Sequence, residues 1–427
     1  MPRSLPAWPV VFFGVAFPVM WVLGLGFAFL PVSGALAAFV MIRRRHAVLP
    51  PAWFLWFGYL VIALASVVQI DTTGRLIGYV LRLGMVLGAT ALAVYVYSAT
   101  PRSIPTGLVY RSMAWLWTFV IVGGWLGILL PEVILQTPFA SVVPGGLLSN
   151  DLVTQLVRPR FAQIEYPYGA DPIIRPAAPF QATNGWGCNI ALLAPLMVRY
   201  LTMLSGWRRW LLLGISVLGI VPALATLNRG LFIGFGIALV YVGARALIAG
   251  RFRLAGAVAG VLVAAALLAT VTGVAGSITE RTETGGTNET RASLYEEAID
   301  RTLQSPLLGY GAPRPSLREE ISVGTQGHVW NIMVSHGFIA LAFYLAYFLV
   351  TAWQGRNARN PADAGHLTAV VGLVLVVFYG LDGPQIAVLL VAGVLSVRDV
   401  RTRPWEGAIG EPNPESGRLA VGAGSTR

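Results

Sequence analysis

Residues 230–248 read GLFIGFGIALVYVGARALI, a run of nineteen positions in which Arg245 is the single charged side chain. A helix needs about 20 such residues to cross the roughly 30 Å of hydrocarbon in a bilayer. Because lipid offers no partners for free backbone groups, a span of this length must be helical. The whole chain follows the same pattern, since 56% of its 427 residues are hydrophobic and 11% are charged, whereas soluble domains hold about 25% charged residues. The sequence therefore predicts an all-α integral membrane protein.

Similar apolar runs recur on both sides of this stretch. We expect about twelve transmembrane helices, at residues 10–27, 29–42, 53–70, 76–97, 113–130, 186–204, 210–227, 230–248, 254–277, 329–351, 367–381 and 386–397. Together they form one polytopic membrane domain, residues 1–397. Residues 398–427 are rich in Pro, Gly and Arg and hold few large apolar side chains, which predicts a disordered tail.

The placement of arginine predicts the orientation, because short cytoplasmic loops of membrane proteins carry an excess of positive charge. One side of the twelve-helix topology collects these arginines: Arg43, Arg44, Arg45, Arg102, Arg111, Arg208, Arg209, Arg251, Arg253, Arg356, Arg359, Arg398, Arg401 and Arg403. We expect this side, with both termini and the tail, to be cytoplasmic. The net charge of +11 is then mostly topogenic, and no nucleic-acid partner is expected.

Two long loops lie on the opposite, outer side of this topology, at residues 131–185 and 278–328. Long loops in a compact protein are often functional. We expect the first to be irregular, with a short amphipathic piece near residues 147–157. In the second, Leu294, Ala298, Ile299 and Leu303 recur at helical spacing, which predicts a helix over residues 289–304 that ends at Ser305-Pro306.

Several motifs around these loops carry a family resemblance. They are Pro179-Phe180-x3-Asn184, Thr226-Leu227-Asn228-Arg229-Gly230, Arg291-x-x-Leu294-x-x-Glu297-Ala298, Ser305-Pro306-Leu307-Leu308-Gly309-Tyr310-Gly311, and His328 before an apolar helix with Gly337. In this combination the chain resembles the O-antigen ligase and Wzy-type O-antigen polymerase superfamily. It departs from the usual pattern at Asn228, where Ser is common, and at Asn331, which members commonly carry directly after the histidine.

The resemblance implies a helical bundle like that of the C-type glycosyltransferases, in the cytoplasmic membrane of a bacterium. It also implies a reaction in which a glycan moves from a polyprenyl-diphosphate carrier, such as undecaprenyl diphosphate, to an acceptor hydroxyl at the outer face. The acceptor is a glycan or a lipid, the anomeric carbon is inverted, and neither metal nor other cofactor takes part. Membrane lipids are the remaining partners.

Arginine is the natural cation for the departing diphosphate, because its guanidinium binds phosphate oxygens in a bidentate manner. All 30 basic residues are Arg. The resemblance points to Arg229, in the turn before residues 230–248, and to Arg291, at the start of the loop helix, as catalytic residues. Each has a simpler alternative: Arg229 reaching up to lipid phosphates, and Arg291 forming a surface ion pair with Glu289 or Glu296.

His328 completes the predicted catalytic set, as a base toward the acceptor hydroxyl or as a hydrogen-bond donor to the diphosphate. The alternative is a histidine that only caps its helix. Asn184, Arg301 and Arg318 are expected to bind substrate, although a solvated face explains both arginines equally well.

Two other functions compete with the enzyme. A transporter or flippase of the lipid-linked glycan would place polar residues near the middle of the bilayer, whereas this chain concentrates them in an outer loop. A member of the family that has lost catalysis and acts as an assembly scaffold is the other alternative. No Asp-x-Asp motif, which would hold a divalent metal on a diphosphate, occurs in the chain.

Overall fold

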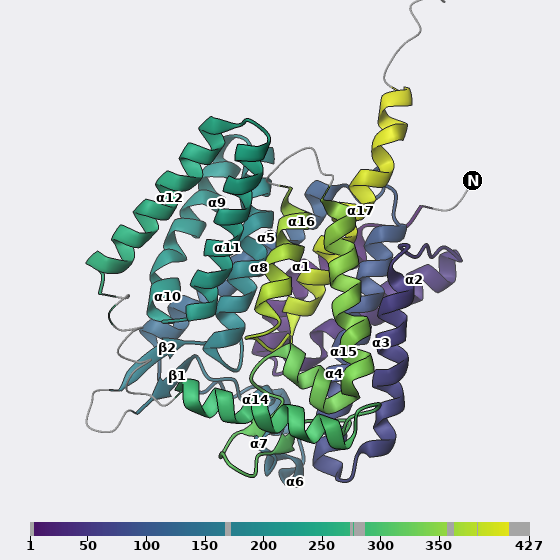
Figure 1. Cartoon of the computed structure of the whole chain (residues 1–427), viewed down its shortest axis with the longest axis vertical. Helices are drawn as coiled ribbons and strands as arrows, with labels where there is room; N and C mark the ends of the chain where they lie inside the picture. Colours follow the sequence, from purple (N-terminus) through teal and green to yellow (C-terminus); the bar gives the residue numbers. More distant parts are fainter. Residues whose placement is uncertain are drawn as a thin grey trace, which may run out of the picture.

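A computed structural model describes residues 4–166, 172–273, 276, 287–356, 363–381 and 383–409. The chain folds as a bundle of helices (Figure 1). Residues 278–286 of the second predicted loop and residues 410–427 of the predicted tail lie outside the described residues.

Each of the twelve expected spans falls on helical structure. In chain order the elements are α1 Trp8–Val22, η1 Gly26–Ala28, α2 Phe29–Arg44, α3 Trp53–Ala65, η2 Ser66–Gln69, α4 Thr73–Ser98, α5 Thr106–Leu129, α8 Thr183–Met203, α9 Gly206–Leu218, α10 Ile220–Ala225, α11 Arg229–Ile248, α12 Phe252–Val271, α15 His328–Gly355, α16 Ala364–Leu375 and α17 Pro384–Ile409. Among the described residues, seven helices are long and apolar enough to cross a membrane, and four further apolar helices are shorter. The chain is a multi-pass membrane protein, and the number of twelve spans stays a prediction.

The last helix corrects one expectation. α17 continues to Ile409, so residues 398–409 are helical where the composition predicted disorder. Arg398 explains how the helix is held at this point. Its buried guanidinium donates hydrogen bonds to the carbonyl oxygens of Val96 and Ile104 and to the Thr106 hydroxyl, which fixes α17 against α4 and α5.

Both long loops gather at one end of the bundle, which we call the loop end. Figure 1 shows α6, α7, β1, β2 and α14 there, while the end of α17 lies at the opposite end. The second loop contributes α14, Thr287–Gln304, which agrees with the expected helix. It also forms a small hairpin of β3, Arg314–Pro315, and β4, Ser322–Val323.

The first loop is more ordered than the sequence indicated. It contains η3 Phe139–Ser141, α6 Gly145–Leu148 and α7 Asp151–Val157, close to the expected amphipathic piece. It also contains an antiparallel pair, β1 Ala162–Glu165 with β2 Ile173–Pro176, in which Ala162 faces Pro176. These strands have four residues each, too few for an alternating pattern to stand out in the sequence.

The decisive irregularity of the fold is a break in α15. Gly337 has φ 83° and ψ 177° inside this helix, a conformation that interrupts the ladder of backbone hydrogen bonds. The segment that carries the Ser305–Gly311 motif repairs the break: Tyr310 N donates to Val334 O (2.9 Å), Gly311 N to Ser335 O (2.7 Å), and Phe338 N to Pro306 O (2.9 Å). Buried backbone groups must be paired, so the motif acts as the missing part of the helix.

The first turn of α15 is satisfied in a similar way from another segment. His328 N donates to Tyr379 O (2.8 Å) and Val329 N donates to Val376 O (3.0 Å). The start of α15 is therefore docked on the turn that follows α16. His328 is fixed in space from both sides, by this turn and by the repaired break nine residues later.

We predict that Gly337→Ala destabilises the protein. The backbone conformation costs a residue with a side chain about 1–3 kcal/mol, and an added Cβ would lie 2.4 Å from Pro306 O. The midpoint of thermal aggregation in detergent should fall. Gly236→Ala in α11 is the matched control, because its Cβ would meet nothing within 4 Å; an equal effect of both substitutions would contradict the role assigned to the break.

Candidate functional site

A cavity of about 250 Å³ opens at the loop end. We call it the loop-end cavity. Its wall is built from α1 and α2, α4, α7, the start of α8, α14, the turns before α15 and α17, and the first turn of α17. The lining residues include Trp21, Met85, Gln155, Phe180, Gln181, Asn184, Gly185, Arg291, Thr325, Gln326, Gly383, Pro384 and Gln385. Segments far apart in the sequence thus meet around one space. Two of the six predicted site residues, Asn184 and Arg291, line it.

Arg291 reaches this cavity because α14 is anchored by its apolar face. Leu294 and Ala298 are buried against Met333 and Val334 of the first part of α15 and against Val323 of β4. In addition, Tyr295 of α14 stacks on Trp330 of α15, with ring centroids 4.0 Å apart.

The Arg291 side chain is not fully satisfied within the protein. Its Nε is buried and has no hydrogen-bond partner in the described part of the chain. Glu296, one of the ion-pair partners considered for it, contacts Arg318 instead, at 3.5 Å. Arg291 therefore offers a donor to a ligand in the cavity.

Arg229 is the first residue of α11 and half-buried. Asn228 caps this helix by accepting from Leu231 N (3.3 Å), and its amide donates to Thr183 O (3.1 Å), the carbonyl next to Asn184. The loop-end cavity has Asn184 in its wall but not Arg229. The structure thus holds Arg229 at the same end of the bundle as Arg291, without bringing it to the cavity wall.

Arg175 is a buried cation that the sequence did not single out. It lies on β2, 4% exposed, where its Nε donates to Thr226 O (2.8 Å) and its Nη1 pairs with Glu165 (2.6 Å). Arg175 therefore holds the 226–230 turn to the β1–β2 hairpin and positions the start of α11. No sequence motif marks Arg175, because its contact with Thr226 depends on where the hairpin lies in the folded protein.

His328 faces a second, smaller cavity of about 30 Å³. We call it the histidine chamber; it is lined by Tyr59, Tyr79, Arg82, Met85, His328, Asn331, Ser335, His336 and Leu381, among others. Met85 lines both cavities. His328 thus lies next to the loop-end cavity rather than inside it.

The hydrogen bonds assign the neutral tautomer of His328. Leu381 N donates to His328 Nδ1 at 3.2 Å. Since Nδ1 accepts, the ring proton of the neutral histidine must lie on Nε2. His328 therefore presents an N–H donor at Nε2. This fits the expected role of a hydrogen-bond donor to the diphosphate better than that of a base.

His336 carries its proton on the other nitrogen. The Ser66 hydroxyl has one hydrogen and donates it to Ala63 O (2.7 Å), so its contact with His336 Nδ1 (2.7 Å) is donated by the histidine. The chamber thus contains a donor at His328 and an acceptor at His336 Nε2. Arg82, from α4, was not predicted for the site.

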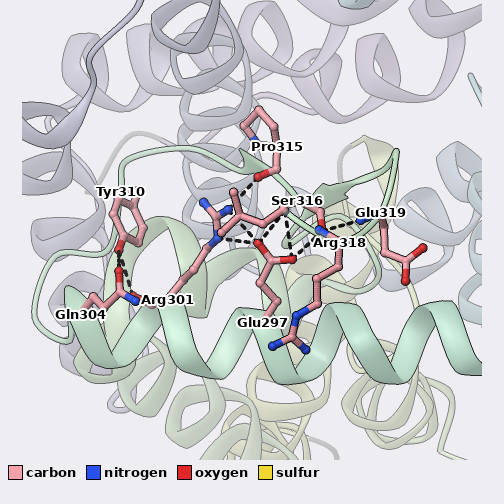
Figure 2. Close-up of polar contacts among 9 residues, drawn as sticks. Glu297, Arg301, Gln304, Tyr310, Pro315, Ser316, Arg318 and Glu319 are labelled. Carbon is pink, nitrogen blue, oxygen red and sulfur yellow. Dashed lines mark hydrogen bonds and ion pairs between the residues drawn. The ribbon is translucent and has the colours of Figure 1, made fainter.

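Arg301 and Arg318 lie elsewhere, in the cluster shown in Figure 2. Glu297 of α14 is 4% exposed and accepts hydrogen bonds from the Ser316 hydroxyl, from Leu317 N (3.0 Å) and from Arg301 Nε (2.7 Å). Arg301 also donates to Pro315 O (2.9 Å). This network clamps residues 315–317 onto α14, and neither arginine lines the two cavities.

The electrostatics of Glu297 agree with a structural clamp. Burial acts to raise its pKa, but the hydrogen bonds from Ser316, Leu317 and Arg301 outweigh burial and lower it. Because the pKa of Glu297 is lower in the folded protein than in the unfolded chain, where a glutamate titrates near pH 4.3, the clamp stabilises the fold fully at pH values above about 4.3. This stabilisation is lost as the pH falls through the lowered pKa of the folded protein. At neutral pH the clamp is fully formed.

A model of the O-antigen ligase family matches residues 214–345. Over this stretch the chain is similar to the O-antigen ligase family. No curated protein matches the chain.

The stretch matched by the O-antigen ligase family runs from α9 into α15. It contains Arg229, Arg291, Arg301, Arg318 and His328, whereas Asn184 lies before it. The resemblance drawn from the motifs is thereby confirmed. The part of the loop-end cavity built by α1, α2, α7, α8 and α17 lies outside the matched residues.

We predict that Glu297→Ala exposes the 312–327 segment to protease. Loss of the carboxylate leaves the Ser316 hydroxyl and Leu317 N without their acceptor, so limited trypsin digestion should cut after Arg318 at least several times faster, as seen by mass spectrometry. The matched control is Asp300→Ala on the same helix, an exposed position. Equal cleavage of both variants would show that Glu297 does not hold this segment.

Proposed function

We propose that this protein transfers a glycan from a polyprenyl-diphosphate carrier to an acceptor hydroxyl, as a ligase or polymerase of cell-surface polysaccharide. The observation that carries the proposal is the loop-end cavity, with the unsatisfied Nε of Arg291 in its wall. The family match supports a glycan-transferring enzyme of this type.

The cavity is suited to an anion for a second reason. α8 and α17 begin in its wall, at Thr183 and Pro384, and Thr325 and Gln326 line it just before α15 begins. The N-terminus of a helix carries a partial positive charge and free backbone N–H groups, which favour phosphate. The first N–H groups of α15 are already paired with Tyr379 O and Val376 O, so the ends of α8 and α17, together with the Arg291 guanidinium, stabilise the negative charge that develops on a departing diphosphate.

His328 acts in this proposal as a hydrogen-bond donor. Its Nε2–H stabilises a diphosphate oxygen or the acceptor oxygen, while Leu381 N holds the ring. In the reaction the acceptor oxygen bonds to the anomeric carbon on one face as the bond to the diphosphate oxygen breaks on the other, which inverts the carbon. The acceptor hydroxyl releases its proton to water on its own face of the sugar, and the diphosphate departs as an anion.

Arg229 is the second cation of the proposal and supports the lipid side of the diphosphate from the start of α11. Asn184, in the cavity wall, contacts the glycan, whereas Arg301 and Arg318 line neither cavity and have no direct part in this proposal. The loop end faces the outside of the bacterial cytoplasmic membrane, and both termini are cytoplasmic. The arginines of the short loops at the other end support this orientation.

The direct test incubates the purified protein with a carrier-linked oligosaccharide and an acceptor, with and without EDTA, and analyses the products by mass spectrometry. Lengthened glycan indicates a polymerase, and transfer to a distinct acceptor indicates a ligase. Absence of any product, together with movement of the donor across liposomes, would assign the protein to the transporters. Sensitivity to EDTA would contradict metal-independent transfer.

We predict that Arg291→Ala lowers the rate of transfer by at least about 100-fold, as loss of one preorganised donor to a developing charge does. Arg229→Ala should also abolish product. Arg253→Ala, an exposed residue of α12, is the control and should retain full activity. A fully active Arg291→Ala variant, expressed at the normal level, would remove Arg291 from the site.

The role of His328 gives a separate prediction. His328→Gln keeps an N–H donor but no basic nitrogen, whereas His328→Leu keeps neither. If His328 donates, the Gln variant should be about tenfold or more faster than the Leu variant, the equivalent of one hydrogen bond. Equal rates in the two variants, at equal thermal stability, would favour His328 as the base.

A further inference from the structure

The proposed reaction gives no role to one buried polar atom in the wall of the loop-end cavity, the side-chain oxygen of Gln385. Gln385, in the first turn of α17, is 3% exposed, and its Nε2 donates to Gly185 O at 3.4 Å. Its Oε1 is buried and finds no hydrogen-bond partner among the described residues. A buried acceptor without a partner is costly, so this oxygen calls for an explanation.

The neighbours of Gln385 fix which way its amide points. Exchanging the oxygen and nitrogen would set Oε1 against the carbonyl oxygen of Gly185, so the hydrogen bond to Gly185 assigns the amide as it stands. Gly383, which also lines the cavity, lies beside the oxygen, since a Cβ on it would be 2.7 Å from Gln385 Oε1. Since Gly383 and Gln385 both line the cavity, the acceptor lies at the cavity wall.

A diphosphate cannot satisfy this oxygen. When ionised it offers only acceptor oxygens, and two acceptors repel each other. A sugar hydroxyl or an acetamido N–H offers the donor that Gln385 Oε1 needs. The unpartnered donor of Arg291 and the unpartnered acceptor of Gln385, which line the same cavity, thus match two different parts of a glycosylated carrier, a phosphate and a sugar.

The rest of the wall suits an uncharged sugar. Gln155, Gln181, Asn184 and Gln326 supply amide groups, and Trp21 and Phe180 supply aromatic rings. Arg291 is the one charged side chain among the lining residues that the structure describes. Few polar groups that fix orientation within an apolar wall are typical of small-molecule sites.

We infer that the loop-end cavity holds the sugar attached to the carrier diphosphate, and that Gln385 selects this sugar by accepting a hydrogen bond from one of its hydroxyl or acetamido groups. The inference rests on the proposed function, because it takes the donor to be a carrier-linked glycan. It assigns a specificity-determining residue outside the stretch that matches the O-antigen ligase family.

The test measures binding to the full-length protein in nanodiscs for three kinds of probe. These are a polyprenyl diphosphate without sugar, the same carrier bearing one neutral hexose or N-acetylhexosamine, and a set of analogues that each lack one hydroxyl or the acetamido group. The wild type should bind one of the analogues about tenfold more weakly than its parent. Gln385→Leu should bind the parent about tenfold more weakly and should no longer distinguish that analogue from it.

Combining Gln385→Leu with the analogue that lacks the sugar group gives a double-mutant cycle. The cycle separates the energy of the hydrogen bond from any general effect of the substitution on the structure of the cavity. Gln385→Glu keeps an acceptor oxygen but sets its second oxygen against Gly185 O and adds a negative charge, so it should bind every probe more weakly while it retains discrimination between the same two probes, even if Gln385→Leu fails to fold. The matched control is Gln354→Leu, in α15, whose Oε1 is likewise buried and unpartnered in the described structure but which lines neither cavity; it should bind all probes like the wild type.

The outcomes also separate the two proposals. The inference is supported if Gln385→Leu binds the sugar-free carrier as tightly as the wild type does but binds the glycosylated probe more weakly. If the wild type binds every probe and no analogue is discriminated through Gln385, the sugar contact is wrong and the proposed function stands. If the wild type binds neither carrier nor glycosylated carrier, both fail.

Discussion

Hydrogen bonds between residues 306–311 and the broken turn of α15 hold the loop end of this protein together. A helix interrupted at Gly337 would leave buried backbone groups unpaired in a bundle that excludes water, at a cost of several kcal/mol for each in lipid. The segment with Pro306, Tyr310 and Gly311 pairs with those groups. One end of the second loop is thereby tied to the bundle, and α14, which precedes this segment, packs on the part of α15 that leads to the break.

The polar residues of the loop end divide into two groups according to their partners. Glu297 and Arg301 satisfy each other and a backbone segment, so they act as a clamp. Arg291 and Gln385 each keep a buried atom without a partner in the described structure. Both residues also line the loop-end cavity, where a ligand can reach the unpartnered atom, which is why the second group, and not the first, carries the functional proposals.

The two cavities share a wall but have different chemistry. The loop-end cavity combines the Arg291 guanidinium, the N-termini of α8 and α17, and uncharged amides. The histidine chamber is small, and its two histidines are held in opposite tautomers by Leu381 N and by Ser66. A glycan donor fits the first space, and the second places an N–H donor beside it.

The sequence by itself determined the membrane class, the positions of the apolar helices, the α14 helix and the resemblance to the O-antigen ligase family, because hydrophobic runs and short motifs are local properties of the chain. Arg291, Asn184 and His328 could be chosen for the same reason, since each belongs to a motif. Only the tertiary structure decided that Arg301 belongs to a clamp, that α17 extends past residue 398, and that Gln385 and Arg82 face the cavities. These depend on which distant segments meet, and a hydrogen bond between residues 200 positions apart, such as that of Gln385 with Gly185, leaves no periodicity in the sequence.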